Sequence, residues 1–134
     1  LLQHAENDWQ AVLREWLNTL LKADTVGQIK WAEEMHQYGR EKQKQFLRYF
    51  THLIESSLRV GYVDSVLKEV SEREKDFAER LNKLCNISQM EAMVTELDKA
   101  AYYIERNANA KMLFTALSIK LFHIIRHQVV PEVR

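Results

Sequence analysis

Residues that interrupt regular secondary structure are rare in this sequence. Its 134 residues contain three glycines and one proline, and the stretches between them are rich in Leu, Glu, Lys, Gln and Ala, which favour helix. Runs of β-branched residues bounded by turn signals, which are typical of strands, are few. We therefore predict an all-α fold, a compact bundle of about six helices in one domain that spans residues 1–134.

The first three helices are predicted from apolar residues that recur at intervals of three and four. The first should run to about Lys22, and Asp24 or Thr25 should cap the second, which should end near Gly39 because glycine tolerates a positive φ. The third follows directly. The apolar residues expected to face the core are Trp9, Val12, Leu13, Trp16, Leu17, Leu20 and Leu21 in the first helix, Ile29, Ala32 and Met35 in the second, and Phe46, Leu47, Phe50, Leu53, Ile54 and Leu58 in the third.

Polar residues mark the starts of the later helices. Ser71 with Glu74, and Ser88 with Glu91, match the capping box, in which a side chain and a backbone amide satisfy each other at a helix start. Asn109 is a good N-cap for the last helix. Residues from about 60 to 70 carry no clear pattern.

The last helix is apolar around most of its circumference. Its polar strip comprises Lys111, Thr115, Ser118 and Arg126, and Phe122 falls inside it. A helix of this kind is typically buried by a neighbour, which suggests a part of an assembly. Trp31 similarly lies off the apolar stripe of its own helix. We predict Trp31 and Phe122 as candidate subunit-interface residues, because aromatic residues are enriched at the centres of protein contacts, with packing in the core as the alternative.

Charge and cysteine content limit the class of protein. Lys+Arg and Asp+Glu both number 19, so no global field draws the chain to nucleic acid or to an anionic membrane. The single Cys85 cannot form an internal disulfide, and we expect a reducing, cytoplasmic location. No apolar run approaches ~20 residues. Since the chain begins at Leu1, we expect it to be part of a longer protein.

No complete set of catalytic, cofactor or metal residues is found. Glu33 and His36 have the Glu-x-x-His spacing of metal sites in helical bundles, but the second pair that such a site needs is missing. His123 and His127 lie one turn apart without a further ligand. Cys85 has no histidine placed beside it by a motif. The glycines form no phosphate-binding loop. We predict no catalytic residue, cofactor or metal; a metal-dependent bundle enzyme that uses Glu33 and His36 remains an alternative.

A basic segment leaves a nucleic-acid contact open. Only one acidic residue, Glu41, lies among the basic residues Arg40, Lys42, Lys44 and Arg48. These basic side chains could contact phosphates, or they could face a partner subunit or solvent. Phe46 falls on the apolar stripe and is expected in the core.

Three blocks of sequence carry a resemblance to a known family. The chain resembles the C-terminal region of bacterial DNA polymerase III delta-prime subunits over about residues 5 to 127. The blocks that carry the resemblance are residues 29–35 (IKWAEEM), residues 39–47 (GREKQKQFL) and the segment from Tyr102 to Leu121, with its IERNANAK block. The resemblance implies a non-catalytic helical collar domain. In that family the collar packs against the collars of gamma/tau and delta in a five-membered clamp loader of the cytoplasmic replisome, which loads the sliding clamp onto primed DNA.

The AAA+-like N-terminal part of that family has no counterpart in these residues. We therefore assign contacts with nucleotide, DNA or the clamp to no residue of this chain. A freestanding helical adaptor or regulatory module that binds another protein remains the alternative function.

Overall fold

Six helices make up the part of the chain that the computed structural model describes, residues 2–62 and 72–127. They are α1 (Leu2–Leu21), α2 (Thr25–Tyr38), α3 (Arg40–Tyr62), α4 (Glu72–Leu84), α5 (Ile87–Glu105) and α6 (Ala110–His127). No strand occurs within these ranges. The prediction of an all-α bundle is confirmed. The expected N-cap at Ser71 lies outside the described residues.

Specific residues end α1 and bound α2. Ala23 turns the chain with a φ of +55°, and Asp24 then caps α2, its Oδ1 accepting a hydrogen bond of 2.9 Å from the Gly27 amide. Gly39 ends α2 with a φ of +88°, which glycine adopts without steric cost. Of the two N-cap residues predicted, Asp24 is therefore the one used, and the predicted end at Gly39 is confirmed.

The start of α5 differs from the prediction by two residues. Asn86, not Ser88, is the N-cap: its Oδ1 accepts from the Gln89 amide at 2.8 Å, and the Gln89 Oε1 accepts from the Asn86 amide at 2.7 Å. The Gln89 side chain also donates to the Ile124 carbonyl at 2.8 Å, so the same residue joins α5 to α6. Asn109 caps α6 as predicted, accepting from the Met112 amide at 3.0 Å.

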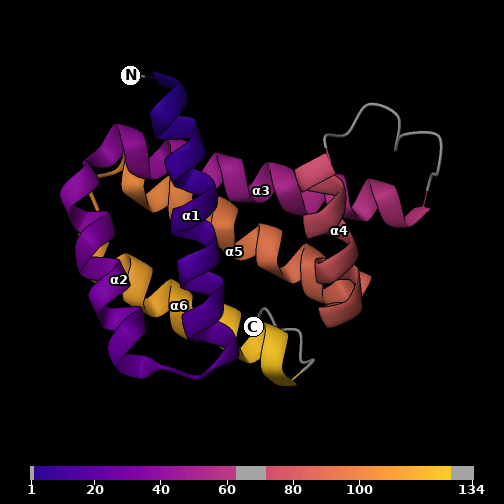
Figure 1. Cartoon of the computed structure of the whole chain (residues 1–134). Helices are drawn as coiled ribbons and strands as arrows, with labels where there is room; N and C mark the ends of the chain where they lie inside the picture. Colours follow the sequence, from indigo (N-terminus) through magenta and orange to yellow (C-terminus); the bar gives the residue numbers. More distant parts are fainter. Residues whose placement is uncertain (1, 63–71, 128–134) are drawn as a thin grey trace.

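The helices surround one core. In Figure 1, α1 lies at the front, α2 on the left and α4 on the right, while α3 crosses the top and α5 and α6 pass behind α1. Helix α3 packs against α4 and α5, and α6 packs against both α2 and α5. Every residue of α3 from Phe46 to Ile54 that was expected in the core is buried, and Leu58 is partly buried.

An aromatic cluster fills the centre of the bundle. Trp16 is fully buried and stacks on Trp31, with ring centroids 4.2 Å apart and an interplanar angle of 6°. The rings of Phe46, Phe50 and Phe114 approach Trp16 at larger angles. Helices α1, α2, α3 and α6 each contribute a ring, so this cluster fixes how four helices meet.

Helix α2 faces the core at Ala32 and Met35 as predicted, but not at Ile29. Its buried residues are Gln28, Trp31, Ala32 and Met35, whereas Ile29 is 40 % exposed. The polar side chain of Gln28 can be buried because its amide donates a hydrogen bond to the Thr19 carbonyl of α1. The expectation that Ile29 faces the core is therefore wrong.

Candidate protein-binding site

Helix α6 has an apolar outer face in addition to its buried one. Phe114, Leu121 and Ile124 are fully buried on the inner side. On the outer side Met112 is 72 % exposed and Ile119 is 51 % exposed, with Ala116 exposed between them. We call Met112, Ala116 and Ile119 the α6 strip. With about 100° of rotation per residue, these three positions fall within one narrow sector of the helix.

Two ion pairs border the α6 strip. Lys111 Nζ lies 3.2 Å from Glu33 Oε1 of α2, and Lys120 Nζ lies 3.3 Å from Glu96 Oε1 of α5. Lys99 adds a second contact to Glu96 at 3.7 Å. These pairs fasten α6 to the helix on each side. The strip therefore lies on a helix held by both neighbours and presents a preformed surface.

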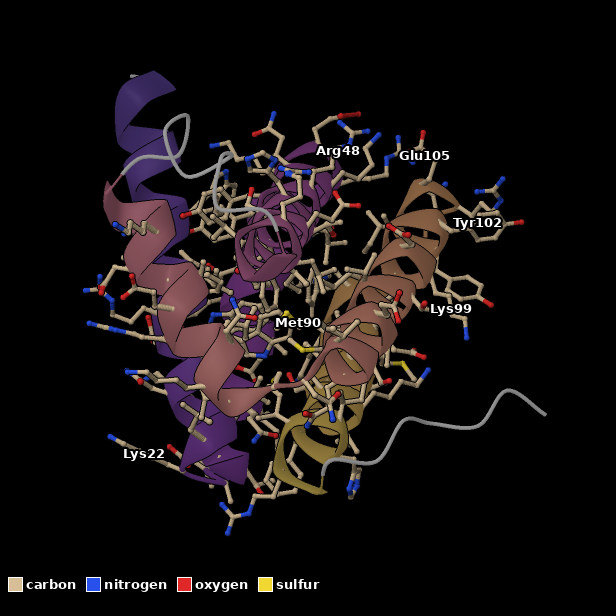
Figure 2. All side chains as sticks on the ribbon, turned by 90° about the vertical axis from the view of Figure 1, so that its right-hand side faces the viewer. Lys22, Arg48, Met90, Lys99, Tyr102 and Glu105 are labelled. Atoms are coloured by element: carbon tan, nitrogen blue, oxygen red, sulfur yellow. The ribbon has the colours of Figure 1, made fainter. Side chains whose placement is uncertain are left out.

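Helix α5 adds an aromatic residue next to the strip. Helices α5 and α6 run antiparallel, as the Gln89–Ile124 and Glu96–Lys120 contacts require. Tyr103 is 53 % exposed and lies two turns beyond Glu96, hence on the same side of α5. Figure 2 shows Lys99 and Tyr102 on the outer side of α5, pointing away from the bundle. The Arg106 guanidinium covers the ring of Tyr102 at 3.5 Å.

Of the two aromatic residues predicted at an interface, only Phe122 is accessible. It is partly buried against the core, lies one turn beyond Ile119, and contacts His123, with ring centroids 5.5 Å apart. Trp31 is 2 % exposed: its ring stacks on Trp16 and its Nε1 donates to the Val12 carbonyl at 3.0 Å. The expectation that Trp31 is exposed until a partner covers it is wrong, because the core of the domain itself encloses the ring.

The polar strip predicted along α6 is interrupted by a buried serine. Ser118 is fully buried, and its Oγ accepts a hydrogen bond of 2.8 Å from Trp16 Nε1. It is therefore part of the core and leaves the outer face more apolar than the sequence indicated. The apolar pattern of the sequence did not distinguish Met112 and Ile119 from the buried positions of α6. Their position between Lys111 and Lys120 is the signal that could have placed them outside.

The metal and nucleophile candidates do not converge on a site. Glu33 and His36 are both exposed, and Glu33 is engaged with Lys111. In the described ranges, no three His, Cys, Asp or Glu side chains gather as metal ligands would. Cys85 is 3 % exposed, and burial raises the pKa of its thiol to about 11, which disfavours the reactive thiolate. His127 ends α6, and its side chain lies outside the described part of the structure.

Two of the four basic residues at the start of α3, Arg40 and Lys44, make contacts within the domain. Lys44 Nζ lies 2.5 Å from Glu105 Oε2 and 3.3 Å from Glu41 Oε1, and Arg40 donates to the side chain of Asn107. The hydrogen bond with Glu105 raises the pKa of Lys44, and the same bond lowers the pKa of Glu105. Arg48 and Glu105 lie near each other at the top of Figure 2. These contacts tie the turn between α5 and α6 to α3.

Phe46, the aromatic residue inside the basic segment, is fully buried and belongs to the core as expected. It therefore offers no stacking platform for a base. In the described part of the chain, no helix combines the length and apolarity needed to cross a bilayer.

Comparison with known proteins identifies no relative: no family model, no curated protein and no solved structure matches the chain. The functional interpretation therefore depends on the geometry of the described residues and on the resemblance in the three sequence blocks.

Proposed function

We propose that this chain is a subunit-assembly domain that binds a helical partner through the α6 strip. The observation that carries the proposal is the apolar outer face of α6, where Met112 and Ile119 are the most exposed large apolar side chains of a helix whose opposite face packs inside the domain. Water contact with these side chains costs free energy that a partner would relieve, at roughly 25 cal/mol per Å² of apolar surface covered.

The construction of the strip supports a docking role. Lys111 and Lys120 hold α6 through ion pairs with α2 and α5, so little conformational entropy is lost when a partner binds. The same lysines and Lys99 surround the apolar centre with a charged rim, the usual anatomy of a specific protein interface. Phe122 and Tyr103 border the strip and enlarge the surface available to a partner.

The resemblance to delta-prime subunits names the assembly. The proposed role is that of a collar domain in a DNA polymerase III clamp loader, which joins the collars of gamma/tau and delta and helps to hold the ring that loads the sliding clamp. The chain contributes no catalytic residue in this role, and contacts with DNA, nucleotide and clamp belong to an N-terminal part. A freestanding helical adaptor would use the same strip with other partners.

A binding experiment tests the proposed assembly. The purified domain is mixed with the collar domains of gamma/tau and delta in the absence of nucleotide and DNA, and complex formation is followed by size-exclusion chromatography with light scattering. The proposal predicts a complex that contains all the collars, since the contact is between helices. Elution of the domain as a separate monomer at concentrations at which gamma/tau and delta collars associate would contradict it.

A further inference from the structure

A second apolar surface lies on the other side of the domain, between α1 and α4. It is a groove with a volume of about 420 Å³. Both helices pack on α3, but they do not pack closely against each other, and they run in the same general direction (Figures 1 and 2). Tyr49 and Leu53 of α3 form the floor. The α6 strip faces away from this groove and contributes no residue to its lining.

Two rows of large apolar side chains form the walls of this α1–α4 groove. Leu13, Leu17 and Leu21 follow one another at intervals of four on α1, and Phe77, Leu81 and Leu84 follow at intervals of four and three on α4. Leu13 and Leu81 are buried at the base of the groove, whereas Leu21 and Leu84 are 41 % and 45 % exposed at its end.

The dimensions of the groove match one face of a helix. Each row spans eight or nine residues of α-helix, with about 10 to 12 Å between its first and last residue. A row of apolar side chains at positions i, i+3 or i+4, and i+7 of an incoming helix has the same length, which is the standard spacing of helix-in-groove recognition. Pockets for small molecules enclose most of their ligand, whereas this groove is partly open to solvent.

Charge at the rim defines the chemistry of the occupant. Arg14 and Arg80 line the groove together with Asp76. Asp76 pairs with Arg80 at 3.1 Å, while Arg14 forms no ion pair with any described residue. Among the described residues, the rim therefore carries one unbalanced positive charge, which favours an acidic partner.

The unbalanced charge also argues against a second copy of this chain as the occupant through its α6 strip. That strip is bordered by Lys111 and Lys120, which would bring further positive charge toward Arg14. From the open apolar walls and the charge of the rim, we infer that the α1–α4 groove binds an amphipathic helix of another polypeptide, with an apolar stripe flanked by acidic side chains. This helix completes a four-helix arrangement with α1, α3 and α4.

A pair of designed peptides tests the inference. The probe is a fluorescein-labelled helical peptide of about five turns with leucines at i, i+3, i+4 and i+7 and glutamates beside the stripe. The matched control peptide carries lysines in place of the glutamates. Fluorescence anisotropy at low and at high salt measures the binding of each peptide to the domain. The wild-type domain should bind the acidic peptide at least about tenfold more tightly than the basic one at low salt.

Three variants locate the binding. Leu17→Gln should weaken binding of the acidic peptide at least about tenfold, as expected for truncation of a central apolar contact. Arg14→Glu should reverse the preference toward the basic peptide. The matched control Ile119→Gln, on the α6 strip, should change nothing. Because Arg14 is exposed, Arg14→Glu still tests the inference if Leu17→Gln lowers the melting temperature measured by circular dichroism.

Several outcomes would overturn the inference. These are equal binding of the two peptides, an unchanged affinity in Leu17→Gln, and a loss of binding in Ile119→Gln. Self-association of the unliganded domain in sedimentation that Leu17→Gln abolishes would make a second copy the occupant and would also overturn it.

Discussion

Replacing Ser118 by alanine should destabilise the domain by removing the acceptor of a buried indole. Trp16 Nε1 donates to Ser118 Oγ at 2.8 Å, and both residues are fully buried. The serine hydroxyl in turn donates to the Phe114 carbonyl at 2.8 Å. In Ser118→Ala the indole N–H keeps its burial and loses its acceptor. An unsatisfied buried donor costs about 1 to 3 kcal/mol, whereas loss of the hydroxyl's own bond to a helical carbonyl that keeps its backbone donor costs little.

Ser57 provides a matched control for this substitution. It is also fully buried, and its Oγ donates to the Leu53 carbonyl at 2.8 Å, but no side chain of the described residues donates to it. Urea unfolding followed by circular dichroism gives the free energy of unfolding of both variants. We expect Ser118→Ala to be less stable than Ser57→Ala by about 1 to 3 kcal/mol. Equal stability of the two variants would refute the reasoning, since it would show that the Trp16 indole finds water or another acceptor at no cost.

Three further predictions concern the core, the thiol and one ion pair. Leu117→Ala on α6 should lower the free energy of unfolding by about 2 to 5 kcal/mol, because Leu117 is 3 % exposed; an unchanged urea midpoint would contradict its place in the core. Cys85 should react with a disulfide reagent at neutral pH far more slowly in the native domain than in urea, because its thiol pKa is about 11 and its side chain is buried; equal rates would contradict this. The folded-state pKa of Glu105 lies below its ordinary value of 4.5, so its contribution to stability is present above that pH and is lost as the pH falls through the folded-state pKa. Glu105→Gln should therefore flatten the acid side of the stability profile, and a profile identical to that of the wild type would count against the Lys44–Glu105 contact.

Helix positions were largely predictable because the signals that set them are local. The turn at Gly39 and the cap at Asn109 depend on the backbone preferences of single residues, and both occur where the sequence indicated. Asn86 shows the limit of this reasoning. Ser88 with Glu91 fits the capping pattern equally well, and Gln89 decides between the two starts through its bond to the Ile124 carbonyl of α6, a contact that sequence spacing does not contain.

The orientation of each helix in the core was less predictable, since it depends on partners distant in sequence. Ile29 and Trp31 lie on different sides of α2, and either side could have faced inward by apolar content alone. Stacking on Trp16 and the Gln28 bond to the Thr19 carbonyl select the side that carries Trp31. The same kind of long-range pairing buries Ser118, a residue that the sequence placed on a polar strip.

The candidate site was predictable at the level of the helix but not of the residues. An apolar pattern around most of α6 indicated contact with a neighbour, and Phe122 remains a predicted interface residue beside the strip. Met112 and Ile119 could not be separated from core positions, because the inward side of α6 is set by the packing of Phe114, Leu121 and Ile124 against other helices, which sequence spacing does not show.

The most direct measurement for the proposed assembly role is the affinity of the domain for gamma/tau and delta collars when the α6 strip is made polar. The double variant Met112→Gln, Ile119→Gln is titrated beside the matched control Ile87→Gln, which alters a 40 % exposed isoleucine on the opposite side of α5 from Glu96. We expect the double variant to fold with an unchanged melting temperature and to bind at least about thirtyfold more weakly, equivalent to about 2 kcal/mol, while the control binds as the wild type does. Undiminished binding by the folded double variant would contradict the assignment of the α6 strip as the assembly surface.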